Sequence, residues 1–283
     1  MRGELSRLSI AIVGLSGTGS IVAEQLLRMG VGELIVIDHD VVEEKNLNRI
    51  LNTTQADADK ARAKVLVFIA AAALSHPATS VIACQNKLGS LEAILAVAQA
   101  DLLFSCVDTY AGRHLADRLA AAMVQPLFDV GVVIPVRNPP RGPVISNICG
   151  RIDYIQPQGP TLADRQVYTP ALLAEEYLRE ANPDAYAGQV KEGYMPGTTE
   201  EAPSVITVNM RAASEVVQEL IARAYPYRWD PNRNYARSDF DLCSGQTSTR
   251  PGDSFSCGPC PHYAQGLSAP LLGLPMLEDL RCA

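Results

Sequence analysis

Short apolar runs alternate with longer segments of helical period over the first half of the chain. The runs predict strands over residues 8–13, 33–38, 80–84, 102–107 and 127–133. The longer segments predict helices over residues 21–29 and 60–74, and further helices that begin near Leu91 and Tyr110. This alternation predicts an α/β fold with a doubly wound, Rossmann-like and mostly parallel sheet.

The second half of the chain has a different pattern. Residues 144–155 alternate in polarity like an antiparallel strand pair, which we expect to extend the sheet. Helices are predicted over 172–181 and 204–224, and Pro203 stands in a position that favours the start of the second one. The stretch 182–203 is rich in glycine, proline and acidic residues, which predicts a mobile crossover loop.

We therefore expect one α/β domain over residues 1–225, followed by a polar, proline-rich C-terminal tail over residues 226–283. With 47% hydrophobic and 19% charged residues, the chain can bury a sizeable core, so wholesale disorder is excluded. The formal net charge of −7 argues against a general nucleic-acid binder, which needs a basic face.

The targeting features of the chain are few. No apolar run reaches the roughly 20 residues of a membrane-spanning helix, and the N-terminal segment leads into a glycine loop instead of a signal-peptide cleavage site. We expect a cytoplasmic protein with no membrane and no nucleic-acid partner.

A glycine-rich loop connects the first predicted strand to the first predicted helix. Gly14, Gly17 and Gly19 permit a tight turn, and the start of the helix offers backbone N–H groups to an anionic phosphate. Ser16 stands where a dinucleotide fingerprint has its second glycine, which argues against an NAD or FAD enzyme. A plain strand-to-helix turn is the alternative interpretation.

Charged residues follow the loop in a pattern that favours a triphosphate. Asp38 ends the second strand 19 residues after Gly19, where a carboxylate can accept hydrogen bonds from ribose hydroxyls. Arg49 and Lys60 would neutralise charge developing on phosphates, which a hydride-transfer enzyme does not need. Asp108 ends a strand at the carboxyl edge of the sheet and suits Mg²⁺. The alternatives are surface ion pairs for the two cations and a helix cap for Asp108.

Four segments together resemble the ThiF/MoeB family, the adenylation domains of ubiquitin-activating-type enzymes. They read IAIVGLSGTGS, LIVIDHDVVEEKNLNRI, DKARAKV and SCVDTYAGR, and the resemblance covers roughly residues 8 to 225. It implies an enzyme that uses ATP and Mg²⁺ to adenylate the C-terminal glycine carboxylate of a ubiquitin-like or sulfur-carrier protein. It also implies a downstream thiol or amine acceptor, and a homodimer.

The resemblance also implies roles for individual residues. Asp38 would hold the ribose, while Asn46, Arg49 and Lys60 would contact the phosphates and Asp108 would coordinate Mg²⁺. Relatives usually carry an N-terminal helix with an arginine that reaches the partner subunit's active site. Only seven residues precede the first strand here, so the source of that arginine is open.

The cysteines depart from the family pattern. Cys257 and Cys260 have the spacing of a zinc-binding pair, but Thr161 and Asp164 stand where the family has its earlier pair. Zinc completed by Cys243 or His262 is one alternative, and two free or oxidised thiols are the other. The crossover segment contains no cysteine, so we expect no thioester on this chain and an acyl-adenylate as the product.

Three other functions stay open from the sequence. Relatives of the same fold adenylate a small molecule, a peptide or a tRNA base. A non-catalytic scaffold could have kept the fold and lost the activity. An NAD-dependent oxidoreductase is the alternative that the glycine spacing disfavours.

Overall fold

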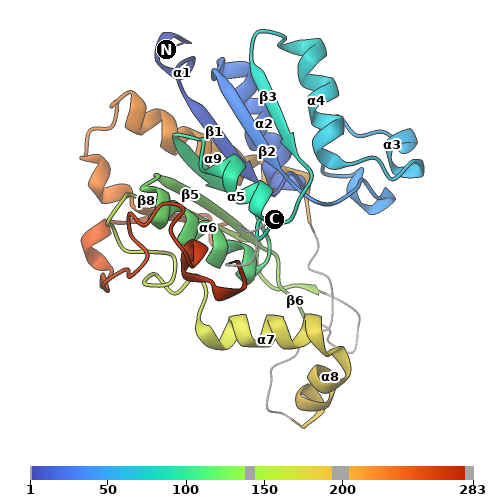
Figure 1. The fold of residues 1–283 in the computed structure, drawn as a ribbon, viewed down its shortest axis with the longest axis vertical. Helices are drawn as coiled ribbons and strands as arrows, with labels where there is room; N and C mark the ends of the chain where they lie inside the picture. The colour runs from blue at the N-terminus through green and yellow to red at the C-terminus, as the bar shows by residue number, and fades with distance from the viewer. Residues whose placement is uncertain (1, 138–143, 193–203, 278–283) are drawn as a thin grey trace.

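The computed structural model describes residues 2–137, 144–192 and 204–277. Eight strands form one sheet in the order β10-β9-β8-β5-β4-β1-β2-β3, and the strand pairs from β5 through β3 are parallel (Figure 1). The pairs that join β5, β8, β9 and β10 are antiparallel. The predicted α/β fold, a mostly parallel sheet extended by antiparallel strands, is confirmed.

The strand bounds agree with the sequence pattern to within a few residues. The sheet consists of β1 (Ser9–Val13), β2 (Glu33–Ile37), β3 (Ser80–Cys84), β4 (Leu102–Ser105), β5 (Leu127–Val133), β8 (Cys149–Ile155), β9 (Arg237–Asp241) and β10 (Gln246–Arg250). A separate two-stranded sheet pairs β6 (Val136–Arg137) with β7 (Val144–Ile145).

Helices cover both faces of the sheet because its central strands are apolar on both sides. In β1, Ile10 and Ile12 pack with α2 (Gly17–Met29), α4 (Lys64–Ser75) and α9 (Ile206–Ala224). Ala11 and Val13 point to the opposite face and pack with α5 (Leu91–Val97) and α6 (Tyr110–Met123). Both faces are therefore buried, as expected for parallel strands.

The helix predicted over 60–74 begins later than expected. The chain first forms α3 (Gln55–Asp59), in which Thr54 accepts a hydrogen bond from the Asp57 amide as the N-cap. Ala61 then adopts a positive φ of 44°, which no α-helix allows, and α4 begins only at Lys64. The capping-box pattern at Thr54 was a readable signal for the extra helix.

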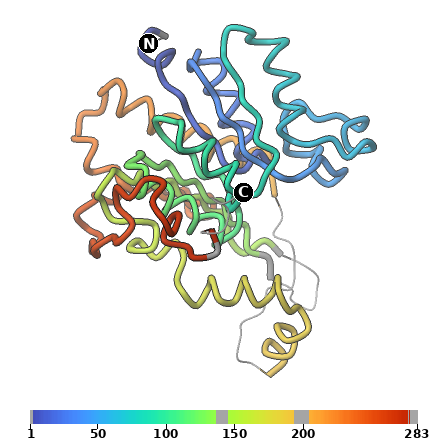
Figure 2. The backbone as a smooth tube through the Cα atoms, in the orientation of Figure 1, coloured from blue at the N-terminus to red at the C-terminus, as the bar shows by residue number. Residues whose placement is uncertain are grey.

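The segment between α7 (Pro170–Ala181) and α9 was expected to be a loop. Residues 183–191 instead form α8, whose Asn182 N-cap accepts from the Ala185 amide and whose first helical residue is a proline. The loop prediction is wrong for these residues, and the rest of it, 193–203, lies outside the described residues. In Figure 2, α7 and α8 extend below the sheet as a projection.

Part of the predicted tail belongs to the sheet. Strands β9 and β10 pair with β8 and with each other, and Leu271 and Leu272 are buried in the same cluster as α6. Within the described residues, no helix is both long and apolar enough to cross a membrane.

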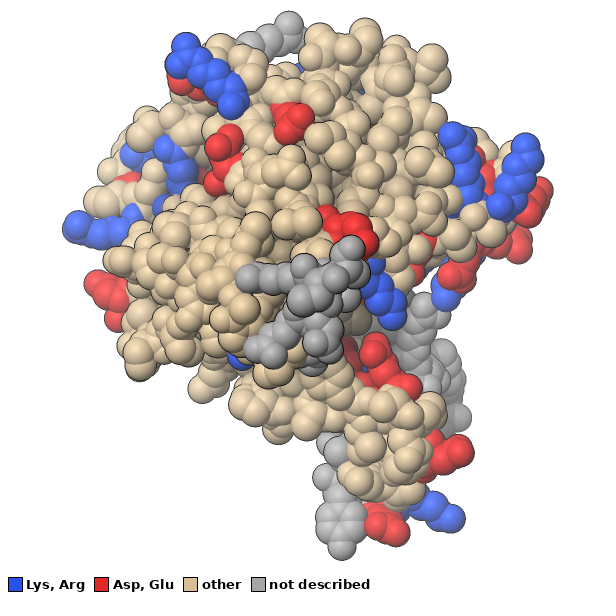
Figure 3. Space-filling model, in the orientation of Figure 1, with Lys and Arg blue, Asp and Glu red and all other residues tan. Residues whose placement is uncertain are grey.

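Charged side chains lie at the margins of the face drawn in Figure 3. They gather where α3 projects and along α8, with both signs interspersed, while the centre of this view is largely uncharged.

Candidate active site

The carboxyl ends of β2, β1 and β4 meet where the strand order reverses. Strand β1 pairs in parallel with β2 on one side and with β4 on the other. In open α/β sheets, ligands bind in the crevice outside the carboxyl ends of the strands, at such a switch point in the strand order. The predicted loop, carboxylate and metal-binding residues all follow these three strands.

The glycine loop is closely packed, and side chains have no room at two of its glycines. A Cβ at Gly19 would overlap the carbonyl oxygen of Gly14, and a Cβ at Gly17 would overlap the side-chain amide of Asn209. Gly14 itself has a φ of 85°, a left-handed conformation that favours glycine. The glycines are therefore required by the close packing of the loop, and the backbone of such a loop at a helix start can cradle a phosphate.

Asp38 links the loop to the end of β2. Its buried carboxylate accepts hydrogen bonds from the Leu15 amide at 2.6 Å and from the Asp40 amide at 2.8 Å. A carboxylate has about four lone-pair positions, so these two bonds leave capacity for ribose hydroxyls.

Arg49 and Asn209 lie against the loop from two different directions. The Cδ of Arg49 is 3.2 Å from the point where a Gly17 Cβ would be. The Arg49 guanidinium donates to the carbonyl of Lys45 at 2.6 Å. Asn209 lies on α9, far from the glycine loop in the sequence. It is buried, and its side-chain amide donates to Ser204 Oγ. Asn209 was not predicted from the sequence because no local pattern connects α9 to the loop.

Asn46 is buried, and its side chain is part of a turn. Its Oδ1 accepts from the Glu43 amide at 3.1 Å, which caps the short 3-10 helix Glu44–Asn46. The predicted phosphate contact would have to come from the remaining side-chain amide of Asn46.

Two lysines near the site differ in their surroundings. Lys60 is exposed at the end of α3, and among the described residues it has no hydrogen bond or ion pair. Lys64 begins α4, its side chain is only 5% exposed, and its Nζ lies 2.8 Å from Asp40 Oδ2. Burial alone would raise the pKa of Asp40, but the Lys64 hydrogen bond and charge outweigh it and lower that pKa. The sequence pattern predicted a phosphate contact for Lys60 and none for Lys64.

Asp108 is exposed beyond the end of β4, and it does not cap the following helix. Thr109 is the N-cap of α6, where its side chain accepts from the Gly112 amide at 3.1 Å. The amides of Tyr110 and Ala111 donate to the buried Glu176 of α7. The carboxylate of Asp108 is thus available to a cation, and α7 is anchored beside it.

A family model described as the ThiF family matches residues 2–223. The chain belongs to the ThiF family. The resemblance of the four sequence segments is thereby confirmed.

The chain is similar to ubiquitin-like modifier-activating enzymes over part of its length. Ubiquitin-like modifier-activating enzyme 5 of Oryza sativa subsp. japonica is 34% identical over 134 residues, 44% of this chain and 32% of that protein. The same enzyme of Drosophila grimshawi is 39% identical over 114 residues, 37% of this chain and 29% of that protein. The matched part spans about a third of the length of these relatives.

Solved structures share the fold over most of the chain. Escherichia coli MccB with ATP superposes with a TM-score of 0.65 at 17% identity, over 94% of this chain and 68% of that chain. The microcin C7 biosynthetic enzyme MccB in complex with N-formylated MccA gives a TM-score of 0.67 at 17% identity, over 94% and 69%. At 17% identity, this similarity shows that the chain shares the fold of MccB and carries no further conclusion.

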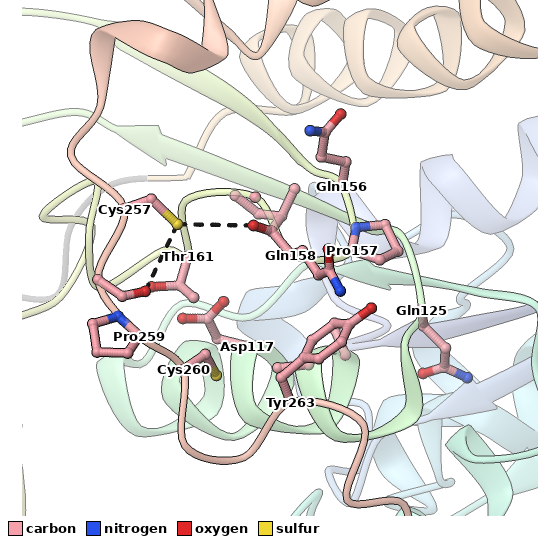
Figure 4. A pocket seen from close by; sticks show the side chains of 15 residues that line it. Asp117, Gln125, Gln156, Pro157, Gln158, Thr161, Cys257, Pro259, Cys260 and Tyr263 are labelled. Atoms are coloured by element: carbon pink, nitrogen blue, oxygen red, sulfur yellow. Dashed lines mark hydrogen bonds between the residues drawn. The ribbon is translucent and has the colours of Figure 1, made fainter.

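The residues at the expected zinc position do not fit a zinc site. Thr161 donates to Asp164 Oδ2 from both its amide and its hydroxyl, at 2.9 Å each, and the Gly258 amide donates to Asp164 Oδ1. Cys257 lies against the carbonyls of Gln158 and Gly258, and in Figure 4 the two sulfur atoms do not point toward one another. Within the described residues, neither Cys257 nor Cys260 belongs to a group of three metal-ligand side chains close enough to hold an ion.

These residues instead border a cavity beside α6. It has a volume of about 360 Å³ and is lined by the Cys257–Cys260 loop, by residues 155–159 and by Asp117, Gln125 and Tyr263 (Figure 4). Through its hydrogen bonds, Asp164 joins the Cys257–Cys260 loop to the segment around Thr161. A zinc ion would otherwise provide this link.

Proposed function

We propose that this ThiF-family protein is an ATP- and Mg²⁺-dependent adenylating enzyme. Its substrate would be the C-terminal glycine carboxylate of a ubiquitin-like or sulfur-carrier protein. The observation that carries the proposal is the close packing of Asp38, Arg49 and Asn209 around a glycine cradle at the β1 crossover. The similarity to ubiquitin-like modifier-activating enzyme 5 and to MccB with ATP supports it.

Each residue around the glycine loop would contact a different part of the nucleotide. Gly14, Gly17 and Gly19 would hold the phosphates through the backbone, and Asp38 would hold the ribose. Asn46, Arg49 and Lys60 would contact the phosphate oxygens, with Lys64 as a second lysine four residues on. Asp108 would hold Mg²⁺ together with phosphate oxygens, and the ion would neutralise part of the triphosphate charge.

The reaction needs no protein nucleophile. A carboxylate oxygen of the substrate attacks the α-phosphorus of ATP, the bond to the bridging oxygen breaks, and acyl-adenylate and pyrophosphate result. Because two anions must meet, catalysis comes from positioning them and from screening their repulsion. Cδ of Arg49 lies against Gly17, and its guanidinium, which donates to the Lys45 carbonyl, would turn toward the phosphates when ATP binds.

The acyl-adenylate would pass to another protein. The crossover segment 193–203 carries no cysteine, so the acceptor would be a thiol, a sulfur donor or an amine on a partner. A homodimer that completes each site is part of the proposal, because the resemblance to the ThiF/MoeB family implies one.

Two measurements test the proposal. ATP with Mg²⁺ should raise the thermal unfolding temperature of the protein, whereas NAD should not. Incubation with ATP and small glycine-ended proteins of the source cell should yield one species heavier by an adenylyl group in mass spectrometry. A protein that does not bind ATP would be a scaffold, and adenylation of a peptide or small molecule alone would redefine the substrate.

A further inference from the structure

A group of four arginines surrounds two fully buried carboxylates beside the candidate site. The carboxylates are Asp129 on β5 and Asp153 on β8, which are directly paired across the two strands. The arginines are Arg113 on α6, Arg151 on β8, Arg165 and Arg237. Buried charges are normally paired, and here four guanidinium groups share two fully buried carboxylates, with the half-buried Asp239 near Arg151 and Arg237.

The two ends of the group differ in how their arginines are paired. Asp153 accepts from Arg165 at 2.9 Å and from Arg237 at 2.8 and 3.1 Å. Arg165 donates further to the carbonyls of Ala236 and Tyr154. These two arginines are therefore satisfied by the fold itself.

At the other end Arg151 bridges both carboxylates, with its Nε 2.8 Å from Asp153 and its Nη2 bonded to Asp129, so Arg113 is the guanidinium that lacks a close acceptor. Asp129 is occupied by a hydrogen bond from Arg151 and another from Ser105 Oγ at 2.7 Å. Arg113 is only 11% exposed, yet its Nε is 3.5 Å from Asp129, and its one hydrogen bond, to the Val130 carbonyl, is also 3.5 Å long. Within the described residues, Arg113 has no better acceptor for its five N–H groups.

Both guanidinium groups converge on Gly131. A Cβ at Gly131 would lie 3.2 Å from Nη2 of Arg151 and 3.3 Å from Nη2 of Arg113. Because Gly131 has no side chain, two positively charged N–H donors face the space above its Cα. A carboxylate is the planar anion that such donors bind best.

The place of this pair along the sheet indicates which anion it would bind. Ser105, the last residue of β4, pairs with Asp129, so Gly131 lies beyond the end of β4 on the side where Asp108 follows. Along this edge the order is Asp38 after β2, the glycine loop after β1, Asp108 after β4, and then the guanidinium pair. Adjacent strands are about 4.8 Å apart, so the pair lies roughly 10 Å past the phosphate cradle, away from the ribose position.

We propose that Arg113 and Arg151, aligned over Gly131 by Asp129, form the binding site for the carboxylate of the acyl substrate. This site rests on the proposed adenylation and deepens it, because it is where the substrate carboxylate would first be bound before it advances to the α-phosphorus. Arg113 contacts the substrate directly. Asp129 is a positioning residue that orients Arg151.

The experiment uses N-acetylglycylglycine as a small carboxylate probe and its C-terminal amide as the uncharged control. Binding to the full chain, saturated with a non-hydrolysable ATP analogue and Mg²⁺, is measured by calorimetry. We expect the acid to bind at least about tenfold more tightly than the amide. Equal binding, or no binding of the acid, would overturn the proposal without any variant having to fold.

Variants then locate the site. Arg113→Gln removes the charge, and Gly131→Ala places a methyl group against both guanidinium groups. Each should weaken acid binding at least about tenfold while leaving the amide and the nucleotide unchanged. Arg118→Gln is the matched control, because Arg118 lies on the same helix but donates to the carbonyls of Leu272 and Gly273.

Two outcomes separate this inference from the proposed function. If ATP does not bind at all, the adenylation proposal fails, while acid binding without nucleotide still tests the arginine pair. If Arg113→Gln weakens binding of inorganic phosphate or ATP and leaves the acid unaffected, the pair belongs to the nucleotide, and the proposal of a carboxylate site is wrong.

Discussion

The carboxylate of Asp38 accepts a hydrogen bond of 2.6 Å from the backbone amide of Leu15, inside the glycine loop. A second amide, that of Asp40, donates to the other oxygen. One buried side chain thus joins the end of β2 to the loop after β1. The same residue that would recognise ribose also fixes the shape of the phosphate cradle.

The first prediction follows from this double role. Asp38→Ala leaves the Leu15 and Asp40 amides without acceptors, so it should cost about 1–3 kcal/mol of folding free energy. It should also raise the Kd for ATP at least about tenfold, since each 1.4 kcal/mol is a factor of ten. Urea unfolding and calorimetry measure the two effects. Asp59→Ala is the control because its carboxylate is exposed and accepts only from Gln55; equal ATP binding by both variants would contradict the prediction.

The glycine cradle gives a second prediction. A methyl group at Gly19 would overlap the Gly14 carbonyl, so Gly19→Ala should destabilise the protein by about 1–3 kcal/mol or more and abolish ATP binding. Gly188, inside α8, has no atom within 4 Å of the corresponding position. Gly188→Ala should therefore stabilise by about 0.5–1 kcal/mol. Thermal unfolding compares the two, and a Gly19→Ala protein as stable as wild type would show that the loop can rearrange.

Features of the fold and the site that depend on neighbouring residues could be predicted from the sequence, whereas contacts between distant segments could not. The parallel strands and the loop Gly14–Gly19 are local patterns, and both were predicted. The start of α4 was not, because the positive φ of Ala61 has no signature in an alanine. Asn209 and Glu176 reach the site from elements far along the chain, so only the folded structure brings them there. Strand β9 contains Arg237, which pairs with a buried carboxylate, and β10 is an exposed edge strand, so an apolar pattern could not identify either of them.

The two lysines give a third prediction with two separate readouts. Lys60 is exposed, so Lys60→Ala should lower ATP–pyrophosphate exchange by about 10²–10³ while leaving stability within about 0.5 kcal/mol of wild type. Lys64→Ala removes the buried partner of Asp40 and should lower the unfolding temperature as well. Exchange at the wild-type rate in Lys60→Ala, together with loss in Lys64→Ala, would transfer the phosphate contact to Lys64.

The fourth prediction concerns zinc. Since Asp164 holds the Cys257–Cys260 loop through the Gly258 amide, purified protein should contain no stoichiometric zinc, and a chelator should leave its unfolding temperature unchanged. Asp164→Ala should destabilise by about 1 kcal/mol or more. Cys257→Ser, at an exposed thiol, should change stability by less than about 0.5 kcal/mol. Elemental analysis that finds one zinc per chain, lost in Cys257→Ser, would contradict this assignment.

The fifth prediction is a pH dependence that originates on α6. Burial, together with the nearby charges of Arg118 and His262, lowers the pKa of His114 to about 4. The unfolded chain binds this proton near the ordinary value of about 6.5, so the folded state loses stability as the pH falls from about 6.5 to 4. His114→Gln removes that contribution, and its free energy of unfolding should decline less on acidification than that of wild type.

A neighbouring group provides the opposite sign for comparison. Burial raises the pKa of Asp117 to about 6, although the amides of Leu162 and Ala163 and the hydroxyl of Tyr168 donate to it. Its contribution to stability is lost as the pH rises from about 4 to 6, so it partly cancels the effect of His114 in wild type. In His114→Gln this cancellation ends. Urea unfolding at about pH 4.5 and pH 6.5 should then give a difference in free energy shifted toward greater stability at the lower pH, and an unchanged difference would show that His114 titrates normally.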